Sequence, residues 1–257
     1  MRTMRIIALI FLMIGVDARA ERITEPKCLS KSIDFWYQVY TKLDNDTVFV
    51  LDAKSKDLSV LWKASISSDD RLRKSEIRRI KTHYLKHGKK VRIVSGIRSK
   101  FQEGLVRDAM YRKDVESEIN KMSLPLELSA LPHVESSYNP KARSKVGALG
   151  MWQVMPATAR LHGFDPKKMM HPVYNTRAGL AVLKEAYDEL KSWPLAITSY
   201  NHGLNGVRRA VKEVGSTDLC EVLDKYDGPR FGVSSRNFYA SFLAVLRYLR
   251  EEGRLSE

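Results

Sequence analysis

The sequence predicts a mainly helical protein of the α+β class, in which a small N-terminal α/β region with a β-hairpin precedes a compact helical domain. From about residue 116 onward, apolar residues recur at helical spacing after residues that can cap helices. Runs of aromatic and β-branched residues, which favour strands, occur in residues 34–60. With 257 residues, 44% of them hydrophobic and 29% charged, the chain has a globular composition and suffices for one large domain or two small ones.

Residues 1–20 have the pattern of a secretory signal peptide. A positively charged start precedes an apolar run at Ile6–Val16, which is too short to span a bilayer as a helix. Ala18 and Ala20 then provide the small residues of a cleavage site. We expect an exported protein, periplasmic or secreted, whose mature chain begins near Glu21. The alternative is an uncleaved anchor or a buried N-terminal helix.

The chain has two cysteines, Cys28 and Cys220. An oxidising compartment allows them to form a disulfide. Two unrelated buried thiols fit the sequence at least as well, because nothing in it shows that the two residues meet. Two cysteines do exclude a disulfide-rich scaffold and a four-cysteine zinc site.

The hairpin is expected within residues 34–60. One run of aromatic and β-branched residues extends over Phe35–Tyr40, and a second extends over Thr47–Leu51. The polar residues Asp44–Asp46 lie between them. Two such runs joined by a polar turn are typical of a short β-hairpin.

Residues 71–100 carry most of the net charge of +14, since they contain twelve basic residues and one acid, Glu76. A helix is expected here, because Ile77, Ile80 and Tyr84 recur at helical spacing. Asp69 or Asp70 would cap its start, and Gly88 would end it. It is either a solvated surface helix or a docking face for an anionic envelope surface. No nucleic-acid partner is expected, because no motif of that kind is present.

Three helices are predicted in the last third of the chain. The first is capped by Asn175 or Thr176, the second covers Asn205–Val214 before Gly215, and the third is capped by Ser234. We therefore expect a signal peptide at 1–20, a basic region with hairpin and helix at 21–115, and a helical domain at 116–257.

Glu135 is the candidate catalytic residue. It lies near the end of a mostly apolar segment that begins at Leu124, and a loop rich in Ser, Asn and Gly follows it. A carboxyl group half out of water should have a raised pKa, which a general acid at neutral pH requires. This context alone fits an ordinary glutamate at a helix end equally well.

The loop after Glu135 combines small and neutral polar residues. Gly147 and Gly150 permit a tight backbone path beside a ligand, while Ser144 and Gln153 can bind sugar hydroxyls and amides. A second polar cluster occupies residues 199–203, and Tyr239 lies on the last predicted helix.

Together these residues resemble the soluble lytic transglycosylase (SLT) family of peptidoglycan-cleaving enzymes, and within it the branch of membrane-bound lytic murein transglycosylase D. The resemblance covers roughly residues 116–250. The matching positions are Glu135-Ser136, Asn139-Pro140, Ala142, Ser144, Gly147-Ala148, Gly150, Gln153, Pro156, Thr158-Ala159, Tyr200-Asn201, Gly203 and Tyr239. Ser199 stands where the family usually has Ala.

The resemblance implies a lysozyme-like fold with Glu135 as its one catalytic residue. It also implies that a set of polar residues and one methionine binds the glycan, namely Ser136, Ser144, Gln153, Met155, Tyr200, Asn201 and Tyr239. The substrate would be peptidoglycan, cut at the β-1,4 bond between N-acetylmuramic acid (MurNAc) and N-acetylglucosamine (GlcNAc). No cofactor or metal is expected, because the sequence has no metal-binding motif. We also expect the protein to be a monomer.

A single carboxyl group can suffice when the sugar's own N-acetyl oxygen attacks the anomeric carbon. Glu135 would first protonate the bridging oxygen and then, as a carboxylate, accept the proton of the sugar's 6-hydroxyl. The product is a 1,6-anhydro end. If water intercepts instead, the site is a lysozyme, which can act on modified, N-deacetylated peptidoglycan.

Two further hypotheses stay open at this point. One is a non-catalytic wall-binding protein that keeps the fold, against which the intact Glu135 argues. The other is an envelope or nucleic-acid binder built around residues 71–100. His133 and His202 neighbour the site residues, and we expect them to line the groove or to pack behind it.

Overall fold

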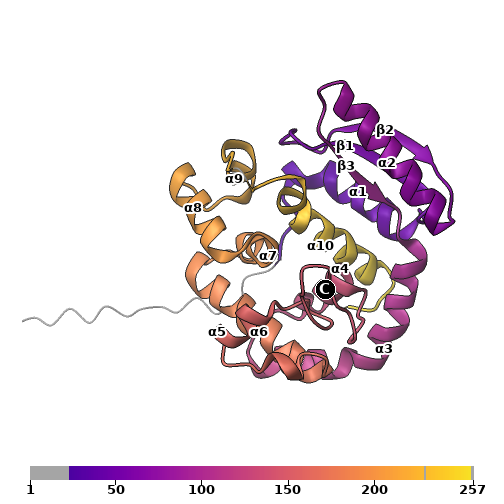
Figure 1. Ribbon diagram of the computed structural model, residues 1–257. Helices are drawn as coiled ribbons and strands as arrows, with labels where there is room; N and C mark the ends of the chain where they lie inside the picture. Colours follow the sequence, from indigo (N-terminus) through magenta and orange to yellow (C-terminus); the bar gives the residue numbers. More distant parts are fainter. Residues whose placement is uncertain (1–22, 229, 256–257) are drawn as a thin grey trace, which may run out of the picture.

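The computed structural model describes residues 23–228 and 230–255, so the predicted signal peptide at 1–20 lies outside the described residues. Helices dominate, with one small sheet near the N-terminus (Figure 1). The elements are α1 (Ser30–Thr41), β1 (Thr47–Asp52), β2 (Val60–Ser65), α2 (Asp70–Lys86), β3 (Val91–Ser95), α3 (Arg98–Lys121), α4 (Leu131–Ser136), α5 (Pro156–Leu161), α6 (Pro172–Leu190), α7 (Trp193–His202), α8 (Leu204–Val214), α9 (Leu219–Lys225) and α10 (Val233–Glu251). The predicted mainly helical class with a small N-terminal sheet is confirmed.

The sheet is antiparallel, in the order β2-β1-β3. Its hairpin joins β1 to β2, with Thr47 opposite Ser65 and Val50 opposite Trp62. The central strand β1 is buried along most of its length, whereas β2 forms an edge with Trp62 largely exposed. The run at Thr47–Leu51 is therefore a strand, as predicted.

The other predicted hairpin arm, Phe35–Tyr40, is wrong, because these residues lie in α1. Phe35 and Val39 pack against Phe49 of the sheet. Ile33 and Tyr40 belong instead to the main helical core. A helix buried on two sides carries apolar residues around most of its circumference, so its sequence loses the one-sided pattern of a surface helix.

The basic helix is confirmed as α2. The side chain of Asp69 accepts hydrogen bonds from the backbone N–H groups of Arg71 and Leu72, which makes it the N-cap. Gly88 follows the helix with a φ of 70°, a conformation that glycine adopts without strain. No residue of α2 is buried, so the helix lies on the outside of the sheet (Figure 1).

The helical core is built around α10, against which α1, α4 and α7 pack (Figure 1). The predicted boundary between residues 115 and 116 falls inside α3, which runs without interruption from Arg98 to Lys121. Residues of α1 share one hydrophobic core with residues of α10. The division into regions 21–115 and 116–257 stays a prediction.

Two predicted helix starts are wrong. Helix α6 begins at Pro172 rather than after Asn175 or Thr176, and the ring nitrogen of His171 accepts from the backbone of Tyr174 as its cap. Helix α10 begins after Gly232, so Ser234 lies in its first turn. Asn175 and Thr176 are buried, and their side chains form hydrogen bonds with Trp152 in the loop before α5. They are therefore not available to cap a helix. The predicted end of α8 at Gly215 is confirmed.

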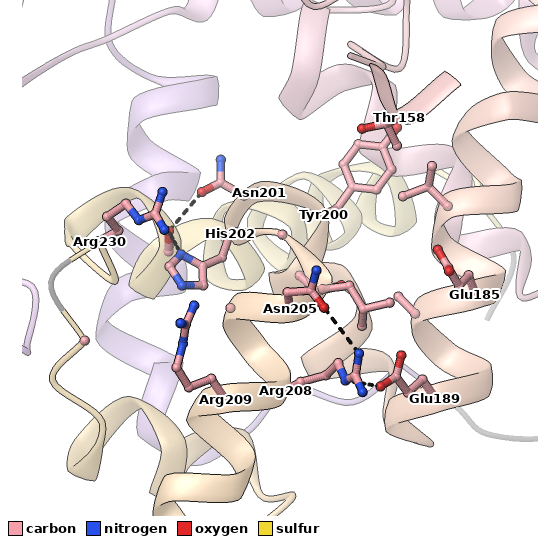
Figure 2. Close-up of a pocket in the computed structure, with 18 of the residues that line it drawn as sticks. Thr158, Glu185, Glu189, Tyr200, Asn201, His202, Asn205, Arg208, Arg209 and Arg230 are labelled. Carbon is pink, nitrogen blue, oxygen red and sulfur yellow. Dashed lines mark hydrogen bonds and ion pairs between the residues drawn. The ribbon is translucent and has the colours of Figure 1, made fainter. Parts of the chain in front are cut away.

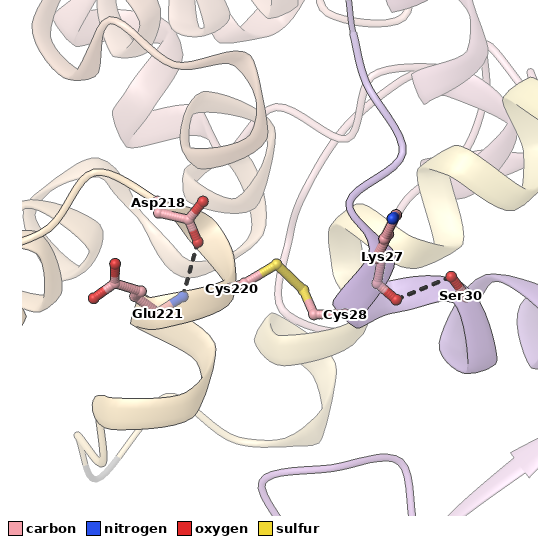
Figure 3. Close-up of a disulfide and its surroundings, with 6 residues drawn as sticks. All are labelled: Lys27, Cys28, Ser30, Asp218, Cys220 and Glu221. Carbon is pink, nitrogen blue, oxygen red and sulfur yellow. Dashed lines mark hydrogen bonds between the residues drawn. A yellow bond between two sulfur atoms is a disulfide. The ribbon is translucent and has the colours of Figure 1, made fainter.

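Cys28 and Cys220 form a disulfide with Cα atoms 6.0 Å apart (Figure 3). It joins the turn before α1 to α9 across a sequence separation of 192 residues. Asp218 caps α9 beside it by accepting from the backbone of Glu221 (Figure 3). The alternative of two separate thiols is excluded.

Within the described part of the chain, none of the helices combines the length and the apolar character that crossing a membrane requires.

Candidate active site

Glu135 lies in the last turn of α4, a six-residue helix with Pro132 in its first turn. The two residues after the helix, Ser137 and Tyr138, have φ values of 53° and 57°, so the chain leaves the helix in the left-handed conformation. The buried hydroxyl of Tyr138 donates to the carbonyl of Ser129 at 2.7 Å, which holds this turn against the segment before α4. The end of the helix that carries Glu135 is therefore fixed from both sides.

The Glu135 side chain is partly shielded from solvent. Burial raises its pKa to about 8, because the charged form loses hydration. It forms no hydrogen bond or ion pair with any described residue that would favour the carboxylate. Protonated at neutral pH, Glu135 has the property that a general acid needs.

Two tyrosines lie within electrostatic range of Glu135. Burial and the Glu135 charge together raise the pKa of Tyr200, on α7, and that of Tyr40, on α1. Tyr200 was predicted as a site residue, but Tyr40 was missed. No local signal marks Tyr40, because it belongs to the N-terminal region and reaches Glu135 only through the packing of α1 on the helical core.

Several predicted glycan-binding residues hold the loop between α4 and α5. The Ser136 hydroxyl donates to the Met151 carbonyl at 2.8 Å. The Ser144 hydroxyl accepts from the Ala148 backbone at 2.9 Å, and the Gln153 amide donates to the Gly150 carbonyl at 2.8 Å. These bonds organise the loop itself, and the predicted glycan contacts of the three residues stay predictions.

Helix α6 supports the same loop from behind, a role that no motif in the sequence indicates. The Asn175 side chain accepts from the Trp152 backbone at 2.8 Å and donates to the Leu149 carbonyl at 3.1 Å. The Thr176 hydroxyl accepts from the Trp152 indole at 3.0 Å. A small residue is also required at Gly179, where an added Cβ would lie 2.7 Å from the Trp152 ring.

Gly150 is predicted to be the loop position least tolerant of a side chain. Its φ is 74°, and an added Cβ would lie 2.4 Å from the Met169 carbonyl oxygen. We expect Gly150→Ala to lower the free energy of unfolding by about 3 kcal/mol, since left-handed strain and crowding add. Urea denaturation measures the loss.

Gly147→Ala is the matched control for this prediction. Gly147 also has a positive φ, 93°, but its added Cβ would meet nothing within 4 Å. It should therefore lose only the strain contribution, about 1 kcal/mol. Equal losses in the two variants would contradict the crowding at Gly150.

The end of α7 carries Tyr200 and Asn201. The Tyr200 hydroxyl donates to the Trp152 carbonyl at 2.7 Å, which ties α7 to the loop that contains Gln153. Asn201 is exposed, and its side-chain oxygen accepts from the Ser235 hydroxyl at 3.2 Å. Met155 is also exposed, immediately before α5. The structure thus brings Glu135, Tyr200 and the loop together.

Tyr239 is placed differently from the other predicted site residues. Its ring is 1% exposed within α10, and its hydroxyl donates to the Thr24 carbonyl at 2.8 Å. The N-terminal segment therefore lies against this residue. A glycan contact of Tyr239 stays a prediction.

A cavity of about 1,120 Å³ extends from Tyr200 and Asn201 toward α8 and the segment before α10 (Figure 2). Thr158 and Glu185 lie on one side of it, and His202 and Arg230 lie on the other (Figure 2). Glu135 is not among the residues that line it. The cavity thus adjoins the candidate catalytic residue through Tyr200.

The two histidines near the site differ in environment. His133 is 1% exposed and packs against the ring of Tyr138, with its Nε2 atom 3.6 Å from the Asp108 carboxylate. Burial lowers the pKa of His133, so its neutral form is favoured. His202 lines the cavity, and burial and two nearby arginines lower its pKa as well. Among the described residues, no group of three or more His, Cys, Asp or Glu could hold a metal ion.

Comparison with known proteins gives matches centred on the same segment. Residues 115–221 match the family model described as the transglycosylase SLT domain. Membrane-bound lytic murein transglycosylase D of Escherichia coli strain K12 is 28% identical over 157 residues, which cover 58% of this chain and 31% of that protein. The transglycosylase of Enterobacteria phage PRD1 is 36% identical over 81 residues, which cover 32% of this chain and 30% of that protein.

Among solved structures, the 70 kDa soluble lytic transglycosylase of Escherichia coli superposes with a TM-score of 0.48 and 23% identity. The superposition covers 56% of this chain and 24% of that one. The present chain spans about a third of the length of the two sequence relatives.

Proposed function

We propose that this protein, whose residues 115–221 match the transglycosylase SLT domain model, cleaves the β-1,4 bond between MurNAc and GlcNAc in peptidoglycan as a lytic transglycosylase. The observation that carries the proposal is Glu135, a carboxyl group with a pKa of about 8 at the head of the matched loop. The names of the sequence relatives, both transglycosylases, support the same activity.

Glu135 acts twice in the proposed reaction. As the acid it gives its proton to the bridging oxygen, while the N-acetyl oxygen of the MurNAc sugar attacks the anomeric carbon and the glycosidic bond breaks. As the carboxylate it then accepts the proton of the 6-hydroxyl, which attacks the same carbon and releases the N-acetyl oxygen. A 1,6-anhydro end forms, and Glu135 regains its proton.

Residues around Glu135 are proposed to orient the sugar. Asn201 and Met155 are exposed beside the loop, and Tyr200 connects the loop to the cavity. Holding the N-acetyl group and the 6-hydroxyl close to the anomeric carbon converts both attacks into intramolecular steps. Ser136, Ser144 and Gln153 contribute by fixing the loop, and we retain Tyr239 as a proposed glycan contact.

The experiment that tests this function is digestion of purified sacculi, with the products analysed by mass spectrometry. Anhydro ends are expected. Reducing ends would show instead a lysozyme-type hydrolase, the second candidate reaction. N-deacetylated glycan separates the two further, because a sugar without its acetyl group cannot make the neighbouring attack. If no preparation yields any product, the enzymatic proposal is wrong and a non-catalytic wall-binding protein is favoured.

We propose that the protein is exported. The disulfide between Cys28 and Cys220 supports this location, because structural disulfides persist in oxidising compartments. The substrate lies outside the cytoplasmic membrane, which agrees with the leader pattern in residues 1–20.

We further propose that the basic surface, defined as the Lys and Arg side chains of residues 71–100, holds the enzyme on an anionic envelope. Within the described residues, nine of these twelve side chains form no hydrogen bond or ion pair: Arg71, Arg78, Arg79, Lys81, Lys86, Lys89, Lys90, Arg92 and Lys100. All nine are exposed. Unpaired surface charges of one sign attract polyanions in a way that salt screens.

Neutralising five of these side chains tests the basic surface. The Gln variant at Arg71, Arg78, Lys81, Lys86 and Lys89 should bind sacculi about tenfold more weakly at low salt, and the difference should vanish at 0.5 M salt. The matched control replaces five exposed basic residues elsewhere, Lys42, Lys113, Arg160, Lys191 and Lys212. Equal weakening in both variants would indicate attraction by net charge alone. Co-sedimentation measures the binding.

A further inference from the structure

Arg209 and Arg230 are two unpaired cations in the cavity beside Asn201. Arg209 belongs to α8 and Arg230 to the segment between α9 and α10, and both approach His202 (Figure 2). Neither forms a hydrogen bond or an ion pair with a described residue, although both are close enough to His202 to lower its pKa. Two different elements thus bring their guanidinium groups close to His202.

Several other charged residues that line the cavity have partners of their own. Arg208 pairs with Glu189 and donates to Asn205 at 3.2 Å (Figure 2). Glu185 lies 3.2 Å from the Nε2 atom of His162, a contact that is an ion pair only when His162 is protonated, and Asp227 lies 3.8 Å from Arg236. Glu213 follows Arg209 by one helical turn on α8, yet no ion pair joins the two among the described residues. The charges that act on His202 are those of Arg209 and Arg230, while Glu213 is an acid of the same cavity that has no ion-pair partner among the described residues.

This corner of the cavity is connected to the proposed glycan site. The Ser235 hydroxyl lies 3.2 Å from both the Asn201 side-chain oxygen and the Nδ1 atom of His202. His202 is favoured in its neutral form, because burial and the two arginines lower its pKa. A ligand in contact with Asn201 can therefore extend along Ser235 and His202 to the guanidinium groups without leaving the cavity.

We infer that Arg209 and Arg230 bind a carboxylate of the peptide that the muramyl sugar carries, so that this enzyme prefers peptide-bearing glycan to bare glycan. Guanidinium groups bind carboxylates through paired, charge-assisted hydrogen bonds. The inference rests on the proposed function, because it takes peptidoglycan as the substrate. The site is concave, so it can receive one side group of a chain, whereas an extended polyanionic surface could not enter it.

The test compares peptide-bearing glycan strands with strands from which an amidase has removed the peptides. For the wild type, kcat/KM should be higher on the peptide-bearing strands. In the double variant Arg209→Gln/Arg230→Gln, the ratio of the two kcat/KM values should fall about tenfold, as expected for loss of charge-assisted hydrogen bonds. Lys212→Gln, on the same helix but outside the cavity, should retain the wild-type ratio.

A binding measurement separates this inference from the proposed function. Calorimetry with the Glu135→Gln protein and a soluble acidic muropeptide should show binding that weakens about tenfold when both arginines are replaced. A muropeptide with amidated carboxyl groups should bind the parent protein equally weakly. An unchanged substrate ratio, or binding of inorganic phosphate in preference to the muropeptide, overturns the inference. Failure of the wild type to cleave either strand overturns the proposed function instead.

Discussion

Glu135→Gln is expected to lower kcat on peptidoglycan about a thousandfold while leaving the fold intact, since positioned general acid–base catalysis contributes roughly 10²–10⁴-fold. Glutamine keeps the size of the side chain but can neither give a proton to the leaving oxygen nor accept one from the 6-hydroxyl. Release of soluble fragments from sacculi, followed by mass spectrometry, measures the rate. If the variant retains a tenth of the wild-type rate, Glu135 is not the general acid of the reaction.

Glu252→Gln is the matched control for this substitution. Glu252 is an exposed glutamate at the end of α10, away from the loop between α4 and α5. Its replacement should leave the rate unchanged, because its exposed side chain lies outside the candidate site. Circular dichroism of both variants checks that each is folded.

The raised pKa of Glu135 makes two pH-dependent predictions. Activity should fall as the pH rises through about 8, because the acid form is lost there. Since the folded-state pKa exceeds the ordinary value of 4.5, ionisation destabilises the folded protein progressively between pH 4.5 and 8. Glu135→Gln should therefore become more stable relative to the wild type over this range, with a constant difference above it. Denaturation at pH 5, 7 and 9 measures the change.

Removing the disulfide is expected to have the largest effect on stability. The bridge closes a loop across a separation of 192 residues, so its loss frees an unusually large part of the unfolded chain. The variant Cys28→Ser/Cys220→Ser should lose about 3–5 kcal/mol of unfolding free energy, according to the chain-entropy dependence on loop length. Urea denaturation of the wild type and the double variant gives the difference.

Reductant provides the internal control for the disulfide. It should shift the unfolding midpoint of the wild type toward that of the serine variant and leave the serine variant unchanged. Equal midpoints for the oxidised and the reduced wild type would show that the bridge makes no contribution. The same measurement reports whether the purified protein carries the bridge.

The candidate site was predictable where its signal is local in sequence. Glu135 and the residues up to Ala159 form one continuous stretch, so the pattern of Ser, Gly and Gln between helices is visible without knowledge of the fold. The apolar character of the segment before Glu135 also predicted the raised pKa, because burial is its cause. The capped basic helix α2 was predictable for the same reason, since its cap and its stop adjoin it.

What the sequence concealed depends on distant packing. Phe35–Tyr40 has the composition of a strand, and it is helical because α1 is covered by the sheet on one side and by the helical core on the other. Asn175 is a residue type that often caps helices, but its side chain instead accepts a hydrogen bond from the Trp152 backbone in the loop. Tyr40 lies near Glu135, and Arg209 near Arg230, because separate helices and loops pack together. The spacing of apolar residues along the chain does not indicate which of these elements will be in contact.

Helix α1 also determines how the enzyme would face its substrate. It packs on the sheet through Phe35 and Val39 and on the helical core through Ile33 and Tyr40, so one helix joins the sheet to the helical core. This packing of α1 favours a fixed orientation of the basic surface relative to Glu135. A molecule attached to the wall through α2 would present its groove at one angle and could cut only strands within a fixed reach. Adhesion through this helix would then decide which bonds are cleaved, in addition to how many molecules remain on the wall.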